Sequence, residues 1–387
     1  MTINMNRLFA ALVLLAMSAM SAMAFDWKPQ TNEQIRNDMF AFVEKFSEST
    51  SDRKLSRELD CFLREQRAVS ESAPYAWISA THDFVDRMIL RYPAEISDGG
   101  KCSDERRNLL LLRDYPMHVD DKPKDAPQEL KTAYSSSIKR LYAQAEADAL
   151  EYLSKEWKSQ ALDVYKVYNM GFIFRTKGHV VGVDLQWSGS REQMLELASY
   201  LDVLFITHPH GDHFTRELLE VMLEAGKPVV LPCDLLPGVE NPLKVIIDKD
   251  NPQITQVGGV SFKSMMGNQG PRTPCNVYLI NIGKWNVAHN GDNGVEEAEM
   301  YLSYERVDVL VSACWNGLRE IMSKIKANPS GTECIYLSAH ENEWRHTVDH
   351  REAYEELFRR EDRLGDPSFE YLRSVVMDAA GDRFILK

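Results

Sequence analysis

The stretch Ile206-Thr207-His208-Pro209-His210-Gly211-Asp212-His213-Phe214 decides how this chain is interpreted. Three histidines and one aspartate fall within six residues, directly after an apolar run at residues 203–206. Imidazoles and a carboxylate crowded on one turn would repel or desolvate one another unless a cation lay between them. Neutral imidazole and carboxylate are the usual ligands of zinc and its first-row neighbours. The apolar run predicts a buried strand, and the histidines then form the loop at its carboxyl end, where α/β folds place their sites.

The composition is that of a globular protein with an acidic surplus. Apolar residues make up 44% and charged residues 27% of the 387 residues, which is typical of a folded chain. Asp and Glu together number 58 against 45 Lys and Arg, and no basic stripe is visible. We therefore expect no nucleic-acid partner. A small-molecule substrate, including an anion held by a metal, is compatible with this charge. The oligomeric state stays unknown.

The first residues are typical of a secretory signal peptide. Arg7 precedes an apolar run at residues 8–17, and small residues end at Ala22-Met23-Ala24, which predicts a signal peptide over residues 1–24. The apolar run is too short for a comfortable transmembrane helix; an uncleaved anchor is the alternative. We expect a secreted or periplasmic protein with no stable membrane anchor. Six cysteines, none with C-x-x-C spacing, leave any disulfide pairing open.

Residues 25–160 predict a mostly helical domain. Apolar residues recur there at helical spacing, and Thr31-x-x-Gln34 is typical of a capping box at a helix start. His82 and His118 lie in this region, but each is isolated. They therefore indicate structural or surface positions and no site.

Residues 161–387 have a different pattern, in which strands and helices alternate. Residues 164–183 predict a β-hairpin that ends at Asp184. A last hairpin is expected between residues 375–377 and 383–386. The region therefore predicts an α/β (α+β) domain with two sheets and helices outside them.

Further polar side chains follow later predicted strands. Asp292 comes after the strand at residues 285–288, in a turn for which Gly291 provides the conformational freedom. His340 follows the strand at residues 335–338, and His346 lies in the loop after it. Seven of the ten histidines lie between residues 208 and 350, a concentration that scattered surface or core histidines would not produce.

Taken together, these motifs resemble the metallo-β-lactamase superfamily over residues 163–387. The resemblance is carried by the loop pattern and by three residues after strands: His208-x-His210-x-Asp212-His213, Asp184, Asp292 and His340. The stretch around His340 is loosely similar to an exported bacterial branch of ascorbate-phosphate lactonase-like hydrolases. The resemblance implies an αββα sandwich with the metals at one edge of its two sheets.

The resemblance also implies a role for each of these residues. The implied metal ligands are His208 and His210 for a first metal, Asp212, His213 and His340 for a second, and Asp292 as the bridge. Asp184 would orient the loop from outside the ligand shell. The expected cofactor is zinc, as one or two ions, with another divalent first-row metal as the alternative. Asp212 would accept or orient the proton of the reacting water, and His346 could stabilise a developing oxyanion.

One part of the family pattern is missing. Members of the family usually supply a third histidine to the first metal, but no histidine occurs between residues 214 and 288. Where that histidine is expected, the sequence reads Met265-Met266-Gly267-Asn268-Gln269-Gly270. Asn268 or Gln269 could donate a carbonyl oxygen there, or His289 or water could fill the position. The second metal position is therefore the more complete of the two.

The expected function is that of an exported metal-dependent hydrolase. Metal-bound hydroxide would attack an ester, lactone, amide or phosphoester centre. A phosphodiesterase or nuclease of the same superfamily is one alternative, which the acidic charge disfavours. The other is a metal-binding or pseudoenzyme interaction module in which the helical domain contacts a partner. The sequence does not specify the substrate.

Overall fold

The structure, a computed structural model, describes residues 31–70, 72–92, 104–117, 119, 124–269, 273–294, 306–313, 334–339, 372–376 and 381–387. The predicted signal peptide lies outside these residues. Among the helices described, none is long and apolar enough to cross a membrane.

The chain order of the described elements is a run of helices followed by alternating strands and helices. The helices are α2 (Asn32–Ser49), α3 (Arg53–Val69), α4 (Ala76–Ile89), α5 (Asp104–Met117), α6 (Gln128–Ser154), α7 (Arg191–Tyr200) and α8 (Arg216–Glu224). The strands are β1 (Leu162–Tyr168), β2 (Gly171–Thr176), β3 (His179–Val183), β4 (Val203–Phe205), β5 (Val229–Leu231), β6 (Lys244–Ile246), β7 (Asn251–Val257), β8 (Val260–Gln269), β9 (Thr273–Ile282), β10 (Trp285–His289), β11 (Val309–Ala313), β12 (Cys334–Ala339), β13 (Leu372–Val376) and β14 (Arg383–Leu386).

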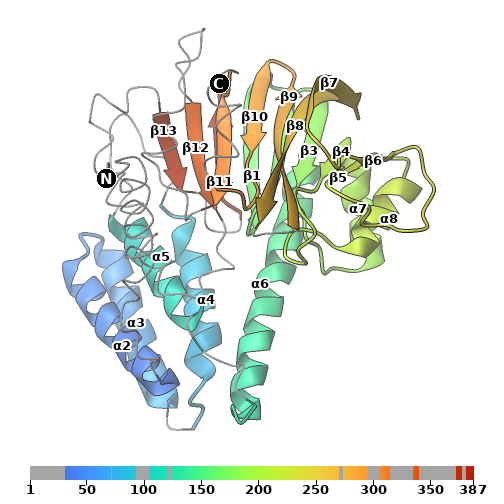
Figure 1. The fold of residues 1–387 in the computed structure, drawn as a ribbon. Coiled ribbons are helices and arrows are strands. Elements are labelled where there is room, and N and C mark those ends of the chain that lie inside the picture. The colour runs from blue at the N-terminus through green and yellow to red at the C-terminus, as the bar shows by residue number, and fades with distance from the viewer. Residues whose placement is uncertain are drawn as a thin grey trace, which may run out of the picture.

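The strands form two seven-stranded sheets, which lie against each other in Figure 1. Sheet 1 has the order β14-β1-β2-β3-β4-β5-β6, and sheet 2 has the order β13-β12-β11-β10-β9-β8-β7. Each sheet is antiparallel on one side and parallel on the other. In sheet 1 the direction changes at β3, and in sheet 2 it changes at β10. The two changes bring the carboxyl ends of parallel strands to an edge shared by both sheets.

The inner faces of the two sheets share one apolar core. Phe205 of sheet 1 contacts Phe262 and Tyr278 of sheet 2, with ring centroids 5.2 Å apart in each pair. Side chains alternate along each strand, so Ile280 faces this core while its neighbour Leu279 belongs to a different apolar cluster. Burial of both inner faces holds the sheets together.

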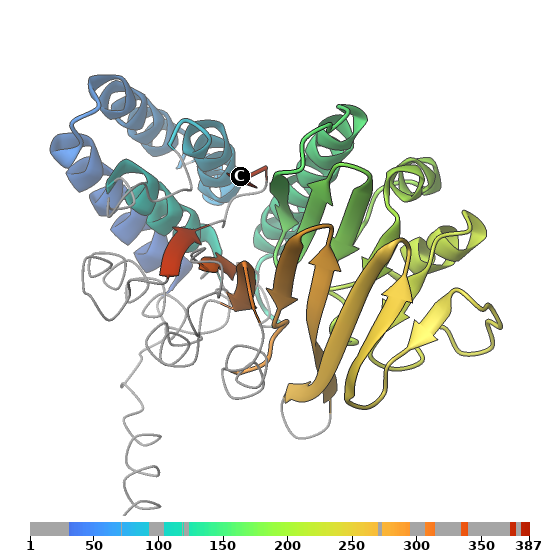
Figure 2. The same cartoon turned by 90° about the horizontal axis from the view of Figure 1, so that it is seen from above.

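Helices cover the outside of this sandwich. Apolar side chains of α6, α7 and α8 pack on the outer face of sheet 1, where they meet Ile173, Leu204 and Ile206. The helices α2–α5 form a separate bundle on the side of the molecule where β11–β13 lie (Figures 1 and 2). A capping box at Thr31 and Gln34 begins α2, as the sequence predicts. The predicted architecture, a two-sheet sandwich with helices outside and a helical N-terminal part, is confirmed.

The predicted last hairpin is wrong. β13 is parallel to β12 in sheet 2, whereas β14 is antiparallel to β1 in sheet 1. Two interactions hold β14 there: Phe384 lies in the core between the sheets, and Arg383 Nε donates to Asp163 Oδ1 at 2.7 Å. Asp163 also accepts from Arg175 Nε at 2.8 Å. The sequence of a short alternating strand does not indicate which sheet the strand joins. Here the buried carboxylate of Asp163, with its two arginine partners, favours the pairing of β14 with β1.

Candidate metal centre

The histidine-rich loop lies where strands of both sheets end. β3 and β4 are parallel neighbours in sheet 1 and end beside it, and β10 of sheet 2 ends opposite. Two hydrogen bonds hold the loop to sheet 2. Tyr278 Oη donates to the carbonyl of Ile206 at 2.9 Å. The backbone N–H of Asn276 donates to the carbonyl of Thr207 at 2.8 Å. The loop is therefore fixed against both sheets.

A glycine brings the second half of the cluster into place. Gly291 has φ +54°, and a Cβ there would lie 2.8 Å from Thr207 and 3.1 Å from Cys275 Sγ. Both the left-handed backbone and the close approach require glycine. Asp292, the next residue, is thereby placed against the histidine loop with almost no exposure to solvent. The predicted role of Gly291 in aiming Asp292 matches this geometry.

The side chains of the loop converge on Asp292. The His208 ring lies 3.9 Å from the His213 ring and 4.6 Å from the His210 ring, measured between centroids. His208 Nε2 is 3.4 Å from Asp292 Oδ2. His213 Nε2 is 3.4 Å from Asp292 Oδ1 and 3.5 Å from Asp212 Oδ2. Each oxygen of Asp292 thus faces a different imidazole.

Asp184 determines which nitrogen of His208 is free. Asp184 accepts hydrogen bonds from the Thr207 amide at 2.7 Å and from Thr207 Oγ1 at 2.6 Å. Because this hydroxyl gives its only hydrogen to Asp184, it can only accept from His208 Nδ1, which is 3.0 Å away. His208 Nε2 therefore carries a lone pair. It is buried and has no hydrogen-bond partner among the described residues.

A lone pair on His208 Nε2 that faces a carboxylate oxygen is repulsive unless something positive lies between them. A proton would draw the two atoms to a charge-assisted hydrogen bond of about 2.7–2.9 Å, which is shorter than the 3.4 Å seen here. Two ligands bound about 2.0–2.2 Å from one tetrahedral metal instead lie about 3.3–3.6 Å apart. The separation fits ligands that share a metal ion.

His213 is oriented in the same way. Its Nδ1 lies 2.9 Å from Asp184 Oδ2, so Nε2 is directed at Asp292 and Asp212. Burial favours the neutral imidazole, but Asp292 and Asp184 outweigh it and raise the pKa of His213 well above the usual value. Burial likewise opposes ionisation of Asp184, yet His213 lowers the pKa of that carboxyl. The cluster therefore has a field that stabilises positive charge.

His289 lies beside the cluster but uses both of its ring nitrogens elsewhere. Nε2 is 3.1 Å from the Met170 carbonyl, and Nδ1 accepts from the Gly291 amide at 3.2 Å. This arrangement requires a neutral ring, and burial lowers the pKa of His289 in agreement. His289 therefore stabilises the turn that carries Asp292, and neither of its ring nitrogens is left to bind a metal.

Gln269 contacts the cluster from the end of β8. Its Nε2 donates to Asp292 Oδ2 at 2.6 Å. Of the two residues that the sequence suggests as amide ligands, Gln269 is the one seen in contact with a predicted metal ligand. The side chain of Asn268 lies outside the described part of the structure, as do His340 and His346. β12 ends at Ala339, one residue before His340.

Two residues near Asp212 were not predicted from the sequence. Asn169, in the turn between β1 and β2, has φ +52° and donates through Nδ2 to Asp212 Oδ2 at 2.9 Å. Lys166 is fully buried and donates to the carbonyl of Asn169. The sequence Asn169-Met170-Gly171 between two strand patterns is a turn signal, but nothing in it indicates contact with a loop more than forty residues later.

Two overlapping triplets of side chains are close enough to share an ion. Their ligand atoms lie within 4.8 Å of one another, and the triplets are Asp184, His208 and His213, and His208, His210 and Asp292. The second triplet is the better candidate, because the oxygens of Asp184 are already engaged with Thr207 and His213. His210 is exposed, so this triplet opens to solvent. Two imidazoles and a carboxylate fit a divalent first-row metal.

The described strands form a two-sheet sandwich with this cluster at one edge, which is the architecture that the resemblance in the sequence implies. Similar solved structures include a metallo hydrolase from Ignicoccus hospitalis, with 13% identity, TM-score 0.41 and coverage of 59% of this chain and 99% of that one. YhfI from Bacillus subtilis, a metallo-β-lactamase fold protein, has 15% identity, TM-score 0.40 and coverage of 59% and 100%.

A third similar structure is CmlA, a diiron β-hydroxylase from Streptomyces venezuelae. It has 16% identity and TM-score 0.39, and the match covers 60% of this chain and 55% of CmlA. No protein-family model matches the sequence, and no curated protein matches it either. At these identities and TM-scores the likeness carries no argument about the chemistry, which is therefore argued from the residues of this chain.

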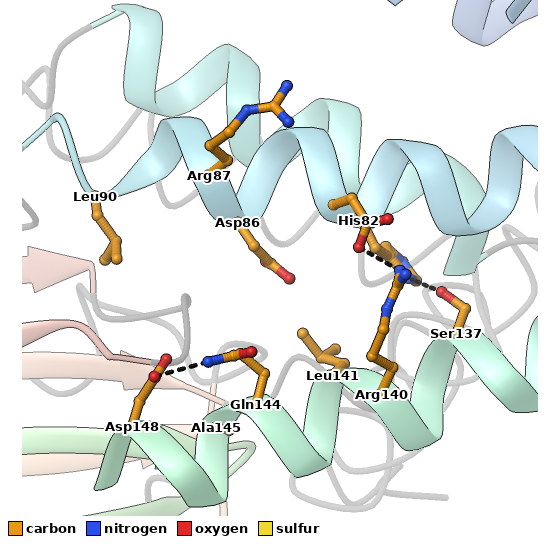
Figure 3. Close-up of a pocket in the computed structure, with 11 residues that line it drawn as sticks. His82, Asp86, Arg87, Leu90, Ser137, Arg140, Leu141, Gln144, Ala145 and Asp148 are labelled. Atoms are coloured by element: carbon orange, nitrogen blue, oxygen red, sulfur yellow. Dashed lines mark hydrogen bonds and ion pairs between the residues drawn. The ribbon is translucent and has the colours of Figure 1, made fainter. Parts of the chain in front are cut away.

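A separate cavity of about 320 Å³ lies between α4 and α6 (Figure 3). Asp86 projects into it from α4, and Leu141 and Gln144 line it from α6. His82 is buried at its wall, with Nδ1 2.7 Å from Ser137 Oγ. None of the residues that line this cavity belongs to the histidine cluster at the sheet edge.

Proposed function

We propose that this chain is a metal-dependent hydrolase. The observation that carries the proposal is the set of separations around Asp292, where one imidazole nitrogen lies 3.4 Å from each carboxylate oxygen. Those separations suit ligands of shared metal ions. His208, His210 and Asp292 would hold one ion, and His213, Asp212 and Asp292 would hold a second, with His340 as the remaining ligand that the sequence suggests.

The exposed side of the cluster suits a reaction with a small substrate. A bound divalent metal would supply a Lewis acid that polarises the substrate and makes a nearby water acidic. Asp212 is partly exposed, with 23% of its side chain accessible, and Asn169 fixes its orientation. Asp212 can therefore accept a proton from a water that approaches from solvent. We take zinc as the first cofactor to test, with manganese and iron as alternatives.

The substrate class is an ester, lactone, amide or phosphoester, all of which have a centre that an activated water can attack. The acidic surplus of the chain favours small molecules over nucleic acids. A metal-binding module without turnover is the remaining alternative. It predicts metal at the cluster and no hydrolysis of any of these classes.

Turnover by the metal-loaded chain, residues 25–387, tests the function. The protein would be loaded with zinc, manganese or iron(II) and assayed on lactones, carboxylic esters, amides, phosphomonoesters and phosphodiesters. The matched pair of variants is His208→Ala and His179→Ala, since His179 lies at the other end of β3 from Asp184. We expect hydrolysis of at least one class, lost in His208→Ala and kept in His179→Ala. Activity that both variants retain would contradict the proposal.

We also propose that residues 1–24 direct export. The support is the order of Arg7, the apolar run and Ala22-Met23-Ala24. Expression of the full chain in a bacterium with N-terminal sequencing of the exported product tests this. The expected first residue is Phe25. Full-length protein retained in the cytoplasm or membrane fraction would contradict it.

A further inference from the structure

The side-chain amide of Gln269 contacts Asp292, and the proposed function assigns no role to this contact. Gln269 is the last residue of β8, and it is paired in register with Thr273 of β9. Its Nε2 donates to Asp292 Oδ2 at 2.6 Å, the same oxygen that lies 3.4 Å from His208 Nε2. Its Oε1 is buried and has no hydrogen-bond partner among the described residues.

As a donor, Nε2 suits the negative charge of the Asp292 carboxylate itself. When an ion lies between His208 and Asp292, the N–H group of Gln269 would face positive charge at close range. The terminal torsion of glutamine is broad and roughly two-fold, and the two ends of the amide have nearly the same size. A half-turn of the amide therefore places an acceptor where the donor was, at little steric cost.

We propose that Gln269 is an amide-oxygen ligand of the metal held by His208, His210 and Asp292. This inference rests on the proposed metal-dependent function. With an ion bound, Oε1 would face the ion; without one, Nε2 would donate to Asp292. Gln269 thus occupies the position that the sequence leaves without a third histidine.

An amide ligand at this position changes which metal the site prefers. Two imidazoles, a carboxylate and an amide give a ligand set of two nitrogens and two oxygens. Amide and carboxylate oxygens suit harder ions such as manganese, whereas a third imidazole would favour zinc. Gln269 is therefore a specificity-determining residue, and it shifts this position away from zinc and toward manganese or iron(II).

Calorimetric titration of the chain, residues 25–387, with zinc and separately with manganese tests the proposal. The informative variants are Gln269→His, Gln269→Leu and the control Asn268→His, which adds the same group one residue earlier in β8. We expect Gln269→His to bind zinc about 10–100-fold more tightly in its weaker step. Gln269→Leu should bind manganese about tenfold more weakly, and Asn268→His should match the wild type.

The visible spectrum of the cobalt(II)-loaded protein gives a second readout that does not depend on activity. An added imidazole in Gln269→His changes the ligand field, so the absorption maximum should move in this variant and not in Asn268→His. Equal zinc affinities and spectra for the two histidine variants, or unchanged manganese affinity in Gln269→Leu, would overturn the role of Gln269 alone. A wild-type chain that binds no metal would overturn the proposed function as well.

Discussion

The candidate metal centre and the cavity between α4 and α6 look alike at first. Each has a fully buried histidine beside a hydroxyl: His208 Nδ1 is 3.0 Å from Thr207 Oγ1, and His82 Nδ1 is 2.7 Å from Ser137 Oγ. Each also has aspartates nearby. They differ in what supplies the positive charge.

In the cavity, the chain supplies the cations itself. Asp83 pairs with Arg140, and Arg113 and Arg140 lie close enough to His82 to lower its pKa. Burial, together with Arg113 and Arg140, lowers the pKa of His82 to about 3. At the metal centre the charge balance is reversed, because Asp292 and Asp184 raise the pKa of His213. A buried histidine therefore indicates a metal site only where carboxylates converge on its free nitrogen.

Replacing the carboxylate at the centre of the cluster should give the largest effect. Asp292→Asn removes the charge that faces both His208 and His213. We expect loss of metal from both positions and a fall in turnover of at least about 1000-fold, since a metal at a reacting centre contributes several kcal/mol. Elemental analysis and steady-state kinetics would measure this. Retention of stoichiometric metal would show that Asp292 is not the shared ligand.

A smaller effect is expected from Asp184, which orients the ligands without facing the ion. Asp184→Asn keeps the shape but cannot accept all the hydrogen bonds from Thr207 and His213. Metal affinity should fall about 10–100-fold, the usual range for such partners. A metal-binding titration against a fluorescent chelator would measure it. Wild-type affinity in this variant would mean that the loop keeps its geometry without Asp184.

Asn169 should affect turnover more than metal content. Asn169→Gly removes the amide that holds Asp212 and keeps a residue that tolerates positive φ. Loss of one hydrogen bond to a carboxylate corresponds to about 1.5–3 kcal/mol, so kcat should fall about tenfold or more while the metal stoichiometry stays unchanged. A variant with full kcat would show that the hydrogen bond from Asn169 to Asp212 does not contribute to turnover.

The smallest effect, and the sharpest contrast, should come from Asp86 in the helical cavity. Burial raises the pKa of Asp86 from 3.8 to about 6. The folded state therefore holds more protons between pH 4 and 6, and stability falls as the pH rises through this window. Asp86→Asn should be more stable above pH 6 by about 1 kcal/mol, less than the full shift implies because the side chain is half-buried.

The measurement for Asp86→Asn is thermal unfolding at pH 8 and pH 4.5, together with metal content. The gain in melting temperature should be present at pH 8 and absent at pH 4.5, and metal content should equal that of the wild type. A loss of metal in this variant would show that the two regions are coupled and would weaken the contrast drawn between them.

The sequence predicts most readily the proximity of candidate side chains that are neighbours along the chain. His208, His210, Asp212 and His213 share one loop, and a loop at the end of a strand needs no long-range information to be recognised. Asp292 was predictable because Gly291 marks the turn that aims it. The sandwich was predictable because apolar and polar residues alternate along its strands.

Features that depend on pairing between distant segments were not predictable in the same way. Asn169, which also accepts from Lys166, contacts Asp212 only because the turn between β1 and β2 lies beside the loop in space. The choice between Asn268 and Gln269 depends on the register of β8 with β9, which composition does not give. The sequence predicts a hairpin of β13 with β14 because the two strands are close along the chain. The residue that places β14 in sheet 1 is the buried Asp163, which pairs with Arg383 and lies more than two hundred residues earlier.

The most direct test of the central claim compares the two buried histidines. The wild-type chain, His208→Ala and His82→Ala would be purified from metal-supplemented cultures, checked for folding by circular dichroism, and analysed for zinc, manganese and iron. We expect His82→Ala to carry as much metal as the wild type and His208→Ala to lose at least one equivalent. Equal metal content in the two variants, or none in the wild type, would contradict it.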